Sequence, residues 1–573
     1  MALSNHLAQG GQTFLHKVRM LRQVLGLAFR LGLVVGLLVF GFLMFINVPV
    51  YVYEHVWKLL EAKATVWIMG DNAQMRNEDG GWVYARDRAT HPGFIYNVTV
   101  YLPYHLKRSA LCGGMALFGI MGLAFVYWSL KGRSDKRRKH LAGSQLVSVE
   151  ELRRQLKRAH KASDIVLGDL PLVKDSETQH VLITGTTGSG KTNCFHTLLP
   201  QIRDKGQRAV IVDTTGEFVS RYYRPGRDIL LNPLDERSVP WHPWAECTEE
   251  YHYDELATNL IPQTGHDPFW VNAARTVFTE TLKVYANKGN YDIQGVLNIL
   301  TVAPLKDLYQ RLQGTKASPL VDPASEKTAL SIRSTLTAAI TSLSYLKTTL
   351  NPFSIRQWVQ STTMFDDWWL FLAMNPEQRD ALRPLVTALT SIAVKSLLGC
   401  TQNQDNRLWV CIDELPSLHK LPDLQLCLAE GRKYGAAVIL GVQNIPQLEE
   451  RYGATITKTM IDLCSTKVLF RAASYEIAVS LSRALGEQEI MDVQEGISYG
   501  ANDVRDGVNL SMVKQMKPIV TAHDLMGLKN LEGYVMLPEF NVVTKVNLPY
   551  VAQAIQGDLN SHQPTVRKNH GHI

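Results

Sequence analysis

Two long uncharged stretches, Leu31–Tyr53 and Ser109–Leu130, dominate the hydrophobic pattern of the first 130 residues. Each is long enough to cross about 30 Å of hydrocarbon as a helix. Aromatic residues stand at their boundaries, as is typical of membrane–water interfaces. We therefore expect residues 31–130 to form a transmembrane hairpin with a connector at 54–108. A signal peptide is disfavoured for the first stretch, because it is too long and no clear small-residue cleavage site follows. A buried soluble helix is the alternative for the second.

A different pattern begins at Asp164, where short apolar runs rich in β-branched residues alternate with turns and helix-like segments. Several of these runs are continuously apolar, which suits parallel strands covered on both faces. The alternation predicts a doubly wound α/β domain. The strand candidates are Val181–Gly185, Ala209–Asp213, Asp228–Leu231, Trp368–Met374, Leu408–Ile412, Ala436–Val442 and Lys467–Arg471.

The strand pattern fades between residues 239 and 359. Asp267 and Asp322 each precede a proline, the arrangement of a helix N-cap followed by a first-turn proline. After the second of them, apolar residues recur at helical spacing. We interpret 239–359 as an all-α domain inserted into the α/β domain, which then occupies 164–238 and 360–559.

The positions of the charges matter more than their number. The chain of 573 residues is 46% hydrophobic and carries a net charge of +7, which allows several packed domains. Basic residues gather in 1–30 and in a linker at 131–163, whereas 54–108 mixes both signs. The positive-inside rule then predicts two cytoplasmic termini and an extracytoplasmic connector. The linker could lie along anionic lipid or be a solvated helix face, and the polar tail at 560–573 is expected to fray. The seven cysteines form no CxxC pair, which argues against zinc ligands or a disulfide framework.

Residues 181–192 join an apolar strand to a glycine-rich loop and a helix-like segment. This is the P-loop pattern G-x-x-x-x-G-K-[ST] in its usual context, and an ordinary Gly/Ser-rich turn is the alternative. Glycines let successive backbone N–H groups point at phosphates, and the following helix places its positive end there. Lys191 would bridge the β- and γ-phosphates of ATP, and Thr192 would hold Mg²⁺. The predicted phosphate-binding residues are Gly185, Thr186, Thr187, Gly188, Ser189, Gly190, Lys191 and Thr192.

A second apolar strand ends in two carboxylates, Asp413 and Glu414, which is the Walker B arrangement. If this strand runs parallel to the P-loop strand, Asp413 lies beside the Mg²⁺ site and Glu414 can polarise the attacking water. Carboxylates often cap strands in other proteins, so the pattern gains its weight from the P-loop.

Two further candidates flank the strand 436–442. Gln443, at its end, could sense the γ-phosphate or orient water. Arg432, in the glycine-flanked loop before it, could reach the nucleotide of a neighbouring subunit as an arginine finger, or it could simply be solvated. Asp213 and Glu217 close an earlier strand at the same sheet edge as the P-loop. They could contact nucleotide or a neighbouring subunit, or belong to an ordinary β-turn.

Over residues 8–548 the chain resembles the TraD-like type IV coupling proteins, inner-membrane ATPases of bacterial conjugation. The likeness rests on the shared order of many segments, few of which are generic ATPase motifs. They are QGGQ (9–12), the two-span anchor, SDIVLGDLPLVKDSE (163–177), the P-loop, LNPLD (231–235), DPFW (267–270), EKTALSIR (326–333), NPFSIRQW (351–358), DELPSLHKLPDL (413–424), GRKYG (431–435) and SYGANDVRDGV (498–508).

The resemblance implies a RecA-like P-loop NTPase core with an inserted all-α domain, assembled as a homo-hexamer around a channel. It implies Mg²⁺-dependent ATP hydrolysis that drives single-stranded DNA, attached to its relaxase, into a type IV secretion channel at the bacterial inner membrane. The family's ATP-site residues match Lys191, Asp413, Glu414, Arg432 and Gln443 here. Some relatives recruit the relaxosome through a long acidic C-terminal extension, whereas the tail here is short and somewhat basic. We therefore expect cargo recognition to rest on the all-α domain or on adaptor proteins.

Two other functions compete with this interpretation. A double-stranded DNA pump of the cell-division type shares the core and anchor, but usually has more membrane spans and an appended DNA-binding domain. A recruitment platform would bind relaxase and effector proteins and use ATP turnover for regulation. Loss of ATP binding at Lys191 separates the two roles, since a platform would keep its cargo and a motor would lose transfer.

Overall fold

The structure is a computed structural model that describes residues 2–77, 79–135, 139–263, 267–347, 349–361, 367–498 and 507–552. The chain divides into two compact units. The first comprises Met1–Lys139 and Met491–Gln515, and the second comprises His140–Ile490 and Met516–Ile573. The predicted tail at 560–573 lies outside the described residues.

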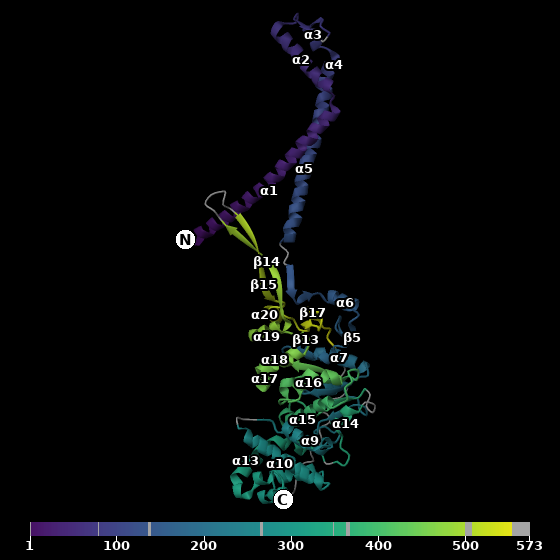
Figure 1. The fold of residues 1–573 in the computed structure, drawn as a ribbon, viewed down its shortest axis with the longest axis vertical. Coiled ribbons are helices and arrows are strands. Elements are labelled where there is room, and N and C mark those ends of the chain that lie inside the picture. Colours follow the sequence, from purple (N-terminus) through teal and green to yellow (C-terminus); the bar gives the residue numbers. More distant parts are fainter. Residues whose placement is uncertain are drawn as a thin grey trace. The chain divides into compact units, whose positions relative to one another are not determined.

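The first unit contains two long apolar helices, α1 (Ala2–Asn47) and α5 (Leu102–Asp135), which pack together (Figure 1). Both contain segments long and apolar enough to cross a membrane. Small residues set their separation: a Cβ added at Gly36 would lie 2.7 Å from the carbonyl oxygen of Gly113. Glycines at such positions let two helix backbones approach closely, as is common between membrane helices.

The stretch Leu31–Tyr53 was expected to be one continuous span, and that expectation is wrong. Helix α1 ends at Asn47, and α2 (Val50–Met69) begins after Pro49. Proline lacks an N–H and disfavours helical geometry at the residue before it, so the helix breaks there. The connector is itself folded, with a hairpin of β1 (Gln74–Arg76) and β2 (Trp82–Tyr84), helices α3 (Ala85–Ala89) and α4 (Pro92–Tyr96), and a π-helical turn at Asn97–Tyr101.

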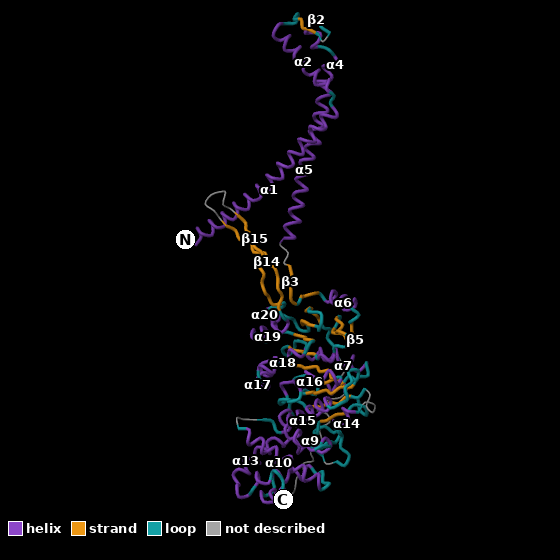
Figure 2. Tube along the Cα trace, viewed as in Figure 1, coloured by secondary structure: helices purple, strands orange, loops and turns teal. Residues whose placement is uncertain are grey.

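The second unit is built on a ten-stranded mixed sheet (Figure 2). The strands from β13 to β9 in the sheet order are parallel, β16 runs antiparallel to β13, and β17 runs antiparallel to β16. In order, the strands are β4 (Gln145–Val147), β17 (Val542–Asn547), β16 (Glu532–Met536), β13 (Thr466–Leu469), β7 (Val181–Thr184), β12 (Ala436–Val442), β11 (Leu408–Ile412), β8 (Arg208–Asp213), β10 (Trp369–Ala373) and β9 (Ile229–Leu231).

Both faces of this sheet are buried, which is why its strands read as continuous apolar runs. Leu182 and Val210 belong to one hydrophobic cluster, whereas Val181 and Ile211 belong to another on the opposite face. Helices contribute to both clusters. The second cluster includes residues of α6 (Val149–Arg158), α7 (Lys191–Asp204), α8 (Glu217–Tyr222) and the hairpin of β5 (Ala162–Leu167) and β6 (Leu170–Val173). The first includes residues of α15 (Arg379–Leu398), α16 (Leu424–Glu430), α17 (Ile445–Tyr452), α18 (Ala454–Leu463), α19 (Tyr475–Leu485) and α20 (Ala522–Met526).

Helix α15 is also long and apolar enough to count as a membrane candidate by composition. Its hydrophobic residues are buried in the first cluster, so its apolar character is explained by the core of the protein. The stretch expected as a basic linker, 131–163, contributes β4 to the sheet and α6 to the core.

All regular elements between β9 and β10 are helical among the described residues. Asp267 caps α10 by accepting the N–H of Phe269, as its sequence context predicts. Asp322 caps only a short 3₁₀ turn, and α13 starts at Glu326. The helices are α9 (Glu250–Leu260), α10 (Pro268–Asn287), α11 (Ile293–Thr301), α12 (Leu305–Leu312), α13 (Glu326–Ile340) and α14 (Ile355–Gln360).

A separate three-stranded sheet consists of β15 (Gly507–Pro518), β14 (Glu487–Ser498) and β3 (Lys139–Gly143). Most of the SYGANDVRDGV segment lies outside the described residues.

Candidate nucleotide-binding site

The P-loop connects β7 to α7, as the sequence predicts. A lack of space explains one of its glycines, and a backbone conformation explains another. A Cβ at Gly185 would lie 2.6 Å from Cβ of Phe470, and Gly190 has a φ of +124°, which L side chains rarely adopt. The loop is held by its neighbours: Thr186 N–H donates to the carbonyl of Arg471 (3.0 Å), and the carbonyl of Ser189 accepts the N–H of Leu531 (2.8 Å).

A cavity of about 700 Å³ opens over this loop. Six of the eight predicted P-loop residues line it, whereas Gly185 and Ser189 are buried and do not. Other lining residues come from the ends of β8, β11 and β12, which lie at the same edge of the sheet because these strands are parallel to β7. The lining residues are Thr186, Thr187, Gly188, Gly190, Lys191, Thr192, Asn193, Thr214, Thr215, Arg379, Asp413, Glu414, Ser417, Gln443, Gln447, Asn530, Leu531 and Tyr550.

Lys191 lies against both carboxylates of the Asp413-Glu414 pair. Its Nζ donates to Oε2 of Glu414 (2.6 Å) and to the backbone carbonyl of Asp413 (2.9 Å), and it lies 3.8 Å from Oδ1 of Asp413. The P-loop lysine and the Walker B pair therefore form one cluster, although they are far apart in the sequence.

Burial raises the pKa of Asp413 to about 6, an effect that nearby Lys191 opposes and that Asp213 and Glu414 reinforce. The carboxylate is 4% exposed, and its Oδ1 has no hydrogen-bond partner among the described residues. The hydroxyls of Thr186 and Thr214 are likewise buried without a partner in the described part of the chain. Unsatisfied buried oxygens are costly, so this pocket is chemically prepared for a cation or a hydrogen-bond donor.

Gln443 bridges the two motifs. Its backbone N–H donates to Oε1 of Glu414 (3.3 Å), and its Nε2 donates to the hydroxyl of Thr187. Because it follows β12, which lies between β7 and β11 in the sheet, its side chain stands between the P-loop and the Walker B strand.

Arg432 is not brought to this cavity. It lies in the 3₁₀ turn before β12 and is exposed, whereas Gln443 follows the same strand. A strand of seven residues spans about 23 Å. Arg432 therefore stands at the opposite edge of the sheet from the P-loop of its own chain.

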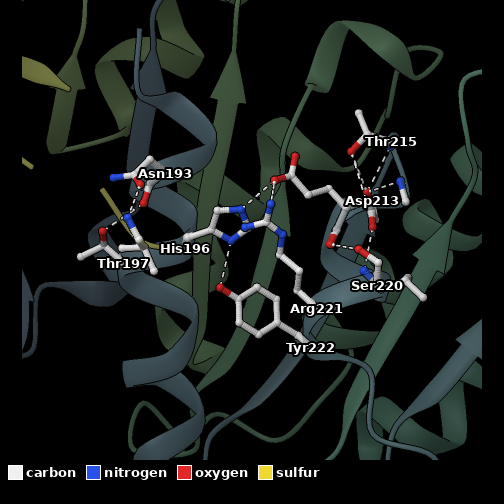
Figure 3. A network of polar contacts seen from close by, with 12 residues as sticks. Asn193, His196, Thr197, Asp213, Thr215, Ser220, Arg221 and Tyr222 are labelled. Atoms are coloured by element: carbon white, nitrogen blue, oxygen red, sulfur yellow. Dashed lines mark hydrogen bonds and ion pairs between the residues drawn. The ribbon is translucent and has the colours of Figure 1, made fainter. Parts of the chain in front are cut away.

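The turn after β8 is shaped by hydrogen bonds to Asp213 (Figure 3). Oδ1 of Asp213 accepts the N–H of Thr215 (3.1 Å) and of Gly216 (2.8 Å), and Oδ2 accepts the N–H of Val219 (2.9 Å). Burial raises the pKa of Asp213 while these bonds lower it. Asp213 thus shapes the turn that presents Thr214 and Thr215 to the cavity.

The same turn is tied to the P-loop helix. The Nε2–H of His196 in α7 donates to Oε1 of Glu217 (2.9 Å). The Nδ1 of the same ring is hydrogen-bonded to the hydroxyl of Tyr222 (2.9 Å), and Figure 3 shows the ring facing Tyr222. Arg221 adds an ion pair to Glu217 (3.1 Å). Glu217 was considered a possible nucleotide contact, but its described partners are His196 and Arg221.

Several cavity residues carried no motif. Arg379 could have been found, because it follows the predicted strand 368–374 and so lies at the same sheet edge. Leu531 lies directly before β16 and Tyr550 lies three residues after β17, and nothing in the sequence marks either of them. Leu531 has a φ of +67°, and Tyr550 is 74% exposed. Asn193 fixes the segment that carries Tyr550, because it donates to the carbonyl of Pro549 (2.9 Å) and accepts the N–H of the residue after Tyr550 (2.8 Å).

Comparison with known proteins places these features in a family context. Residues 164–549 match the family model of the type IV secretion-system coupling protein DNA-binding domain. Over 433 residues the chain is 36% identical to the coupling protein TraD of Escherichia coli (strain K12), which covers 74% of this chain and 60% of TraD. The chain therefore spans about three fifths of the length of that curated relative.

Solved structures of coupling proteins are also similar to this chain. The plasmid coupling protein TrwB in complex with ADP and Mg²⁺ is 27% identical with a TM-score of 0.65, covering 74% of this chain and 96% of that one. TrwB in complex with a non-hydrolysable ATP analogue gives the same identity and TM-score, covering 74% and 97%.

Proposed function

The chain belongs to the type IV secretion-system coupling proteins, and from that premise we propose that it is an inner-membrane ATPase of bacterial conjugation. It couples a relaxase–single-stranded DNA complex to a type IV secretion channel and drives the strand through it. The observation that carries this proposal is the cluster of Lys191, Asp413, Glu414 and Gln443 around a cavity of about 700 Å³.

The residues present fit Mg²⁺–ATP. Asp413 offers a buried oxygen without a hydrogen-bond partner among the described residues, and Thr192 lines the same cavity. One carboxylate and one hydroxyl suit Mg²⁺, which usually completes its coordination with phosphate oxygens and water. When bound, the ion neutralises charge that develops on the transferred phosphoryl group.

The side chains then have distinct tasks. Backbone N–H groups of the P-loop and the ammonium of Lys191 hold the phosphates. Glu414 orients and polarises the attacking water, and Gln443 links that carboxylate to the P-loop hydroxyl of Thr187. Tyr550, exposed at the cavity, offers an aromatic face to the base.

Arg432 is proposed to act on the nucleotide of a neighbouring subunit. Its distance from its own P-loop excludes a role in its own cavity, whereas a head-to-tail ring places one sheet edge against the opposite edge of the next subunit. We therefore propose a homo-hexamer in which each ATP lies between two subunits, with 239–359 as a separate all-α domain.

The decisive experiment measures ATP hydrolysis by the full chain in lipid nanodiscs, with and without single-stranded DNA. Lys191→Ala and Arg432→Ala should each abolish stimulation by DNA, whereas Lys433→Ala, next to Arg432 and paired with Glu430 at 3.7 Å, should retain it. Turnover that DNA does not change, in assembled protein, would contradict the motor and favour a recruitment platform.

Mixing the two inactive variants tests the shared site. An interface formed by the P-loop of the Arg432→Ala subunit and the arginine of the Lys191→Ala subunit is intact. Random assembly of equal amounts should restore roughly one quarter of the wild-type interfaces. No recovery from rings shown to be mixed would refute a trans-acting arginine.

The membrane topology is also a proposal: both termini cytoplasmic and the connector extracytoplasmic. It is supported by the two apolar helices of the first unit and by the basic residues at their ends. Gly80→Cys, in the exposed connector, should react with a membrane-impermeant maleimide in intact spheroplasts, whereas Lys327→Cys should react only after lysis. The reverse labelling pattern would show that the topology is the opposite of the one proposed.

A further inference from the structure

A second cavity of about 660 Å³ lies beside the nucleotide-binding cavity. Its walls come from α9, α10, α15 and α17 and from the segment that follows β11. Among its described lining residues, five are arginine or lysine and one is acidic, a surplus of four positive charges. The cations are Arg275, Arg379, Arg383, Lys420 and Arg451, and the acid is Glu450.

Two of these cations, Arg383 and Arg451, repel each other. Burial and the proximity of Arg383 both lower the pKa of Arg451. Burial lowers the pKa of His419, another lining residue, to about 4, and Arg383 and Arg451 reinforce that shift. Clustering like charges in a partly desolvated site is unfavourable unless an anion compensates them.

The guanidinium groups also keep unused donors. Nε of Arg379 and Nε of Arg383 are buried with no acceptor in the described part of the chain. Arg383 gives one Nη to Asp380 (2.9 Å), whose side chain is 94% exposed. Arg275 is held by the backbone carbonyl of Ile261 (2.7 and 2.9 Å), so its position depends on no carboxylate. The cavity therefore presents oriented donors and uncompensated charge.

We propose that this cavity binds phosphate groups of a single-stranded nucleic acid, an assignment that rests on the proposed function. Arginine donors are well matched to phosphate oxygens. None of the described lining residues is Phe, Tyr or Trp, so they offer no platform for stacking a base. Recognition through the phosphate backbone of the nucleic acid does not depend on its base sequence. A protein that transfers strands of any sequence requires this property. Lys420, one of the lining cations, is exposed to solvent.

The two cavities share three lining residues, Arg379, Ser417 and Gln447. Ser417 lies three residues after Glu414, and Gln447 lies four residues after Gln443. A strand held in the second cavity therefore contacts the segments that follow the two residues proposed to act on the attacking water and the γ-phosphate. This continuity gives the strand a direct physical connection to the site of hydrolysis.

The test uses the full chain in nanodiscs saturated with Mg²⁺–ADP and a fluorescein-labelled oligothymidylate, with binding followed by anisotropy across a salt series. The Arg383→Gln/Arg451→Gln variant removes two cations that do not line the nucleotide cavity. The matched control, Lys306→Gln/Lys327→Gln, removes two exposed cations from helices α12 and α13, away from both cavities.

Loss of two phosphate contacts should reduce the slope of log K against log salt by about 1.4, which corresponds to about sevenfold between 50 and 200 mM salt. The control should keep the wild-type slope, and binding of a fluorescent ADP should be the same in all three proteins. Wild-type affinity and slope in the arginine variant would overturn the assignment while leaving the proposed function standing. If the wild-type chain fails to bind the oligonucleotide at 50 mM salt, the DNA part of the proposed function fails together with this assignment.

A parallel arm titrates inorganic tripolyphosphate into the same Mg²⁺–ADP-saturated protein by calorimetry. The arginine variant could lose tripolyphosphate binding and keep its oligonucleotide binding undiminished. That result would assign the cavity to a free polyphosphate and overturn the assignment to a nucleic-acid strand.

Discussion

His180 lies directly before the P-loop strand and is 1% exposed. Its Nδ1 accepts the N–H of Val438 (3.2 Å), so its Nε2 carries the proton and donates to the carbonyl of Leu428 (3.0 Å). Burial lowers the pKa of His180 to about 4, against an ordinary value of 6.5. The change to test is His180→Gln, because glutamine also offers one acceptor and a donor but does not titrate.

The magnitude follows from linkage. The folded chain keeps His180 neutral down to about pH 4, whereas the unfolded chain takes up a proton below pH 6.5. Folding stability is therefore lost as the pH falls from 6.5 towards 4. At about 1.4 kcal/mol per pKa unit, the loss approaches about 3.5 kcal/mol well below pH 4 and is about 2 kcal/mol at pH 5. Above pH 7 the effect is negligible.

The assay is thermal unfolding of the full chain in nanodiscs at pH 7 and pH 5, followed by tryptophan fluorescence. A difference of about 2 kcal/mol shifts the Tm of a unit of roughly 400 residues by about 2 °C. The wild-type Tm should therefore fall about 2 °C further than that of the variant between the two pH values. The chain has 17 histidines, and comparing the two proteins isolates this one. An equal fall in both would show that His180 titrates normally and would refute the reasoning.

Three further substitutions have defined outcomes. Gly36→Leu should lower the fraction of detergent-solubilised protein that stays monodisperse after heating, because a side chain there meets the backbone of α5 at 2.7 Å, whereas Gly41→Leu meets no atom within 4 Å and should not. Gly435→Ala should lower the Tm more than Gly453→Ala. Both residues have positive φ, a strain of roughly 1–2 kcal/mol for alanine, but only the Cβ at 435 would clash with a backbone oxygen, that of Asn406. Equal losses would contradict that steric argument. Glu246→Gln should cost about 2–3 kcal/mol in unfolding free energy, because the buried carboxylate accepts an indole N–H and two backbone N–H groups at the start of α14. An unchanged unfolding midpoint in denaturant would show that these bonds contribute nothing.

The parallel core could be predicted from the sequence because its strands are buried on both faces. Such strands read as uninterrupted apolar runs, and the predicted Leu408–Ile412 and Ala436–Val442 coincide with β11 and β12. The cluster around Lys191 was predictable for a related reason: the ends of parallel strands meet at one sheet edge, so each residue after such a strand is a candidate.

Other parts of the fold depend on contacts that no local pattern encodes. β4 has three residues, and β17 alternates buried with exposed positions only in its second half, so neither stands out from a loop. Leu531 and Tyr550 reach the cavity because β16 and β17 add to the sheet beside β13. That pairing is determined by tertiary contacts and not by the local sequence. The break at Pro49 could have been predicted, because proline disfavours helix continuity. The predicted span rested on hydropathy alone, which does not register the proline.

The position of β12 explains how the two motifs work as one site. Because β12 lies between the P-loop strand and the Walker B strand, Lys191 must reach across two strand spacings, about 10 Å, to meet Glu414. The end of β12 fills that interval, so Gln443 contacts both the P-loop and Glu414. The segments that continue from β11 and β12 then line the basic cavity through Ser417 and Gln447. A phosphate that displaces the Lys191–Glu414 contact therefore acts on the same two segments that would hold a strand. This is the physical connection that DNA-stimulated ATP hydrolysis requires.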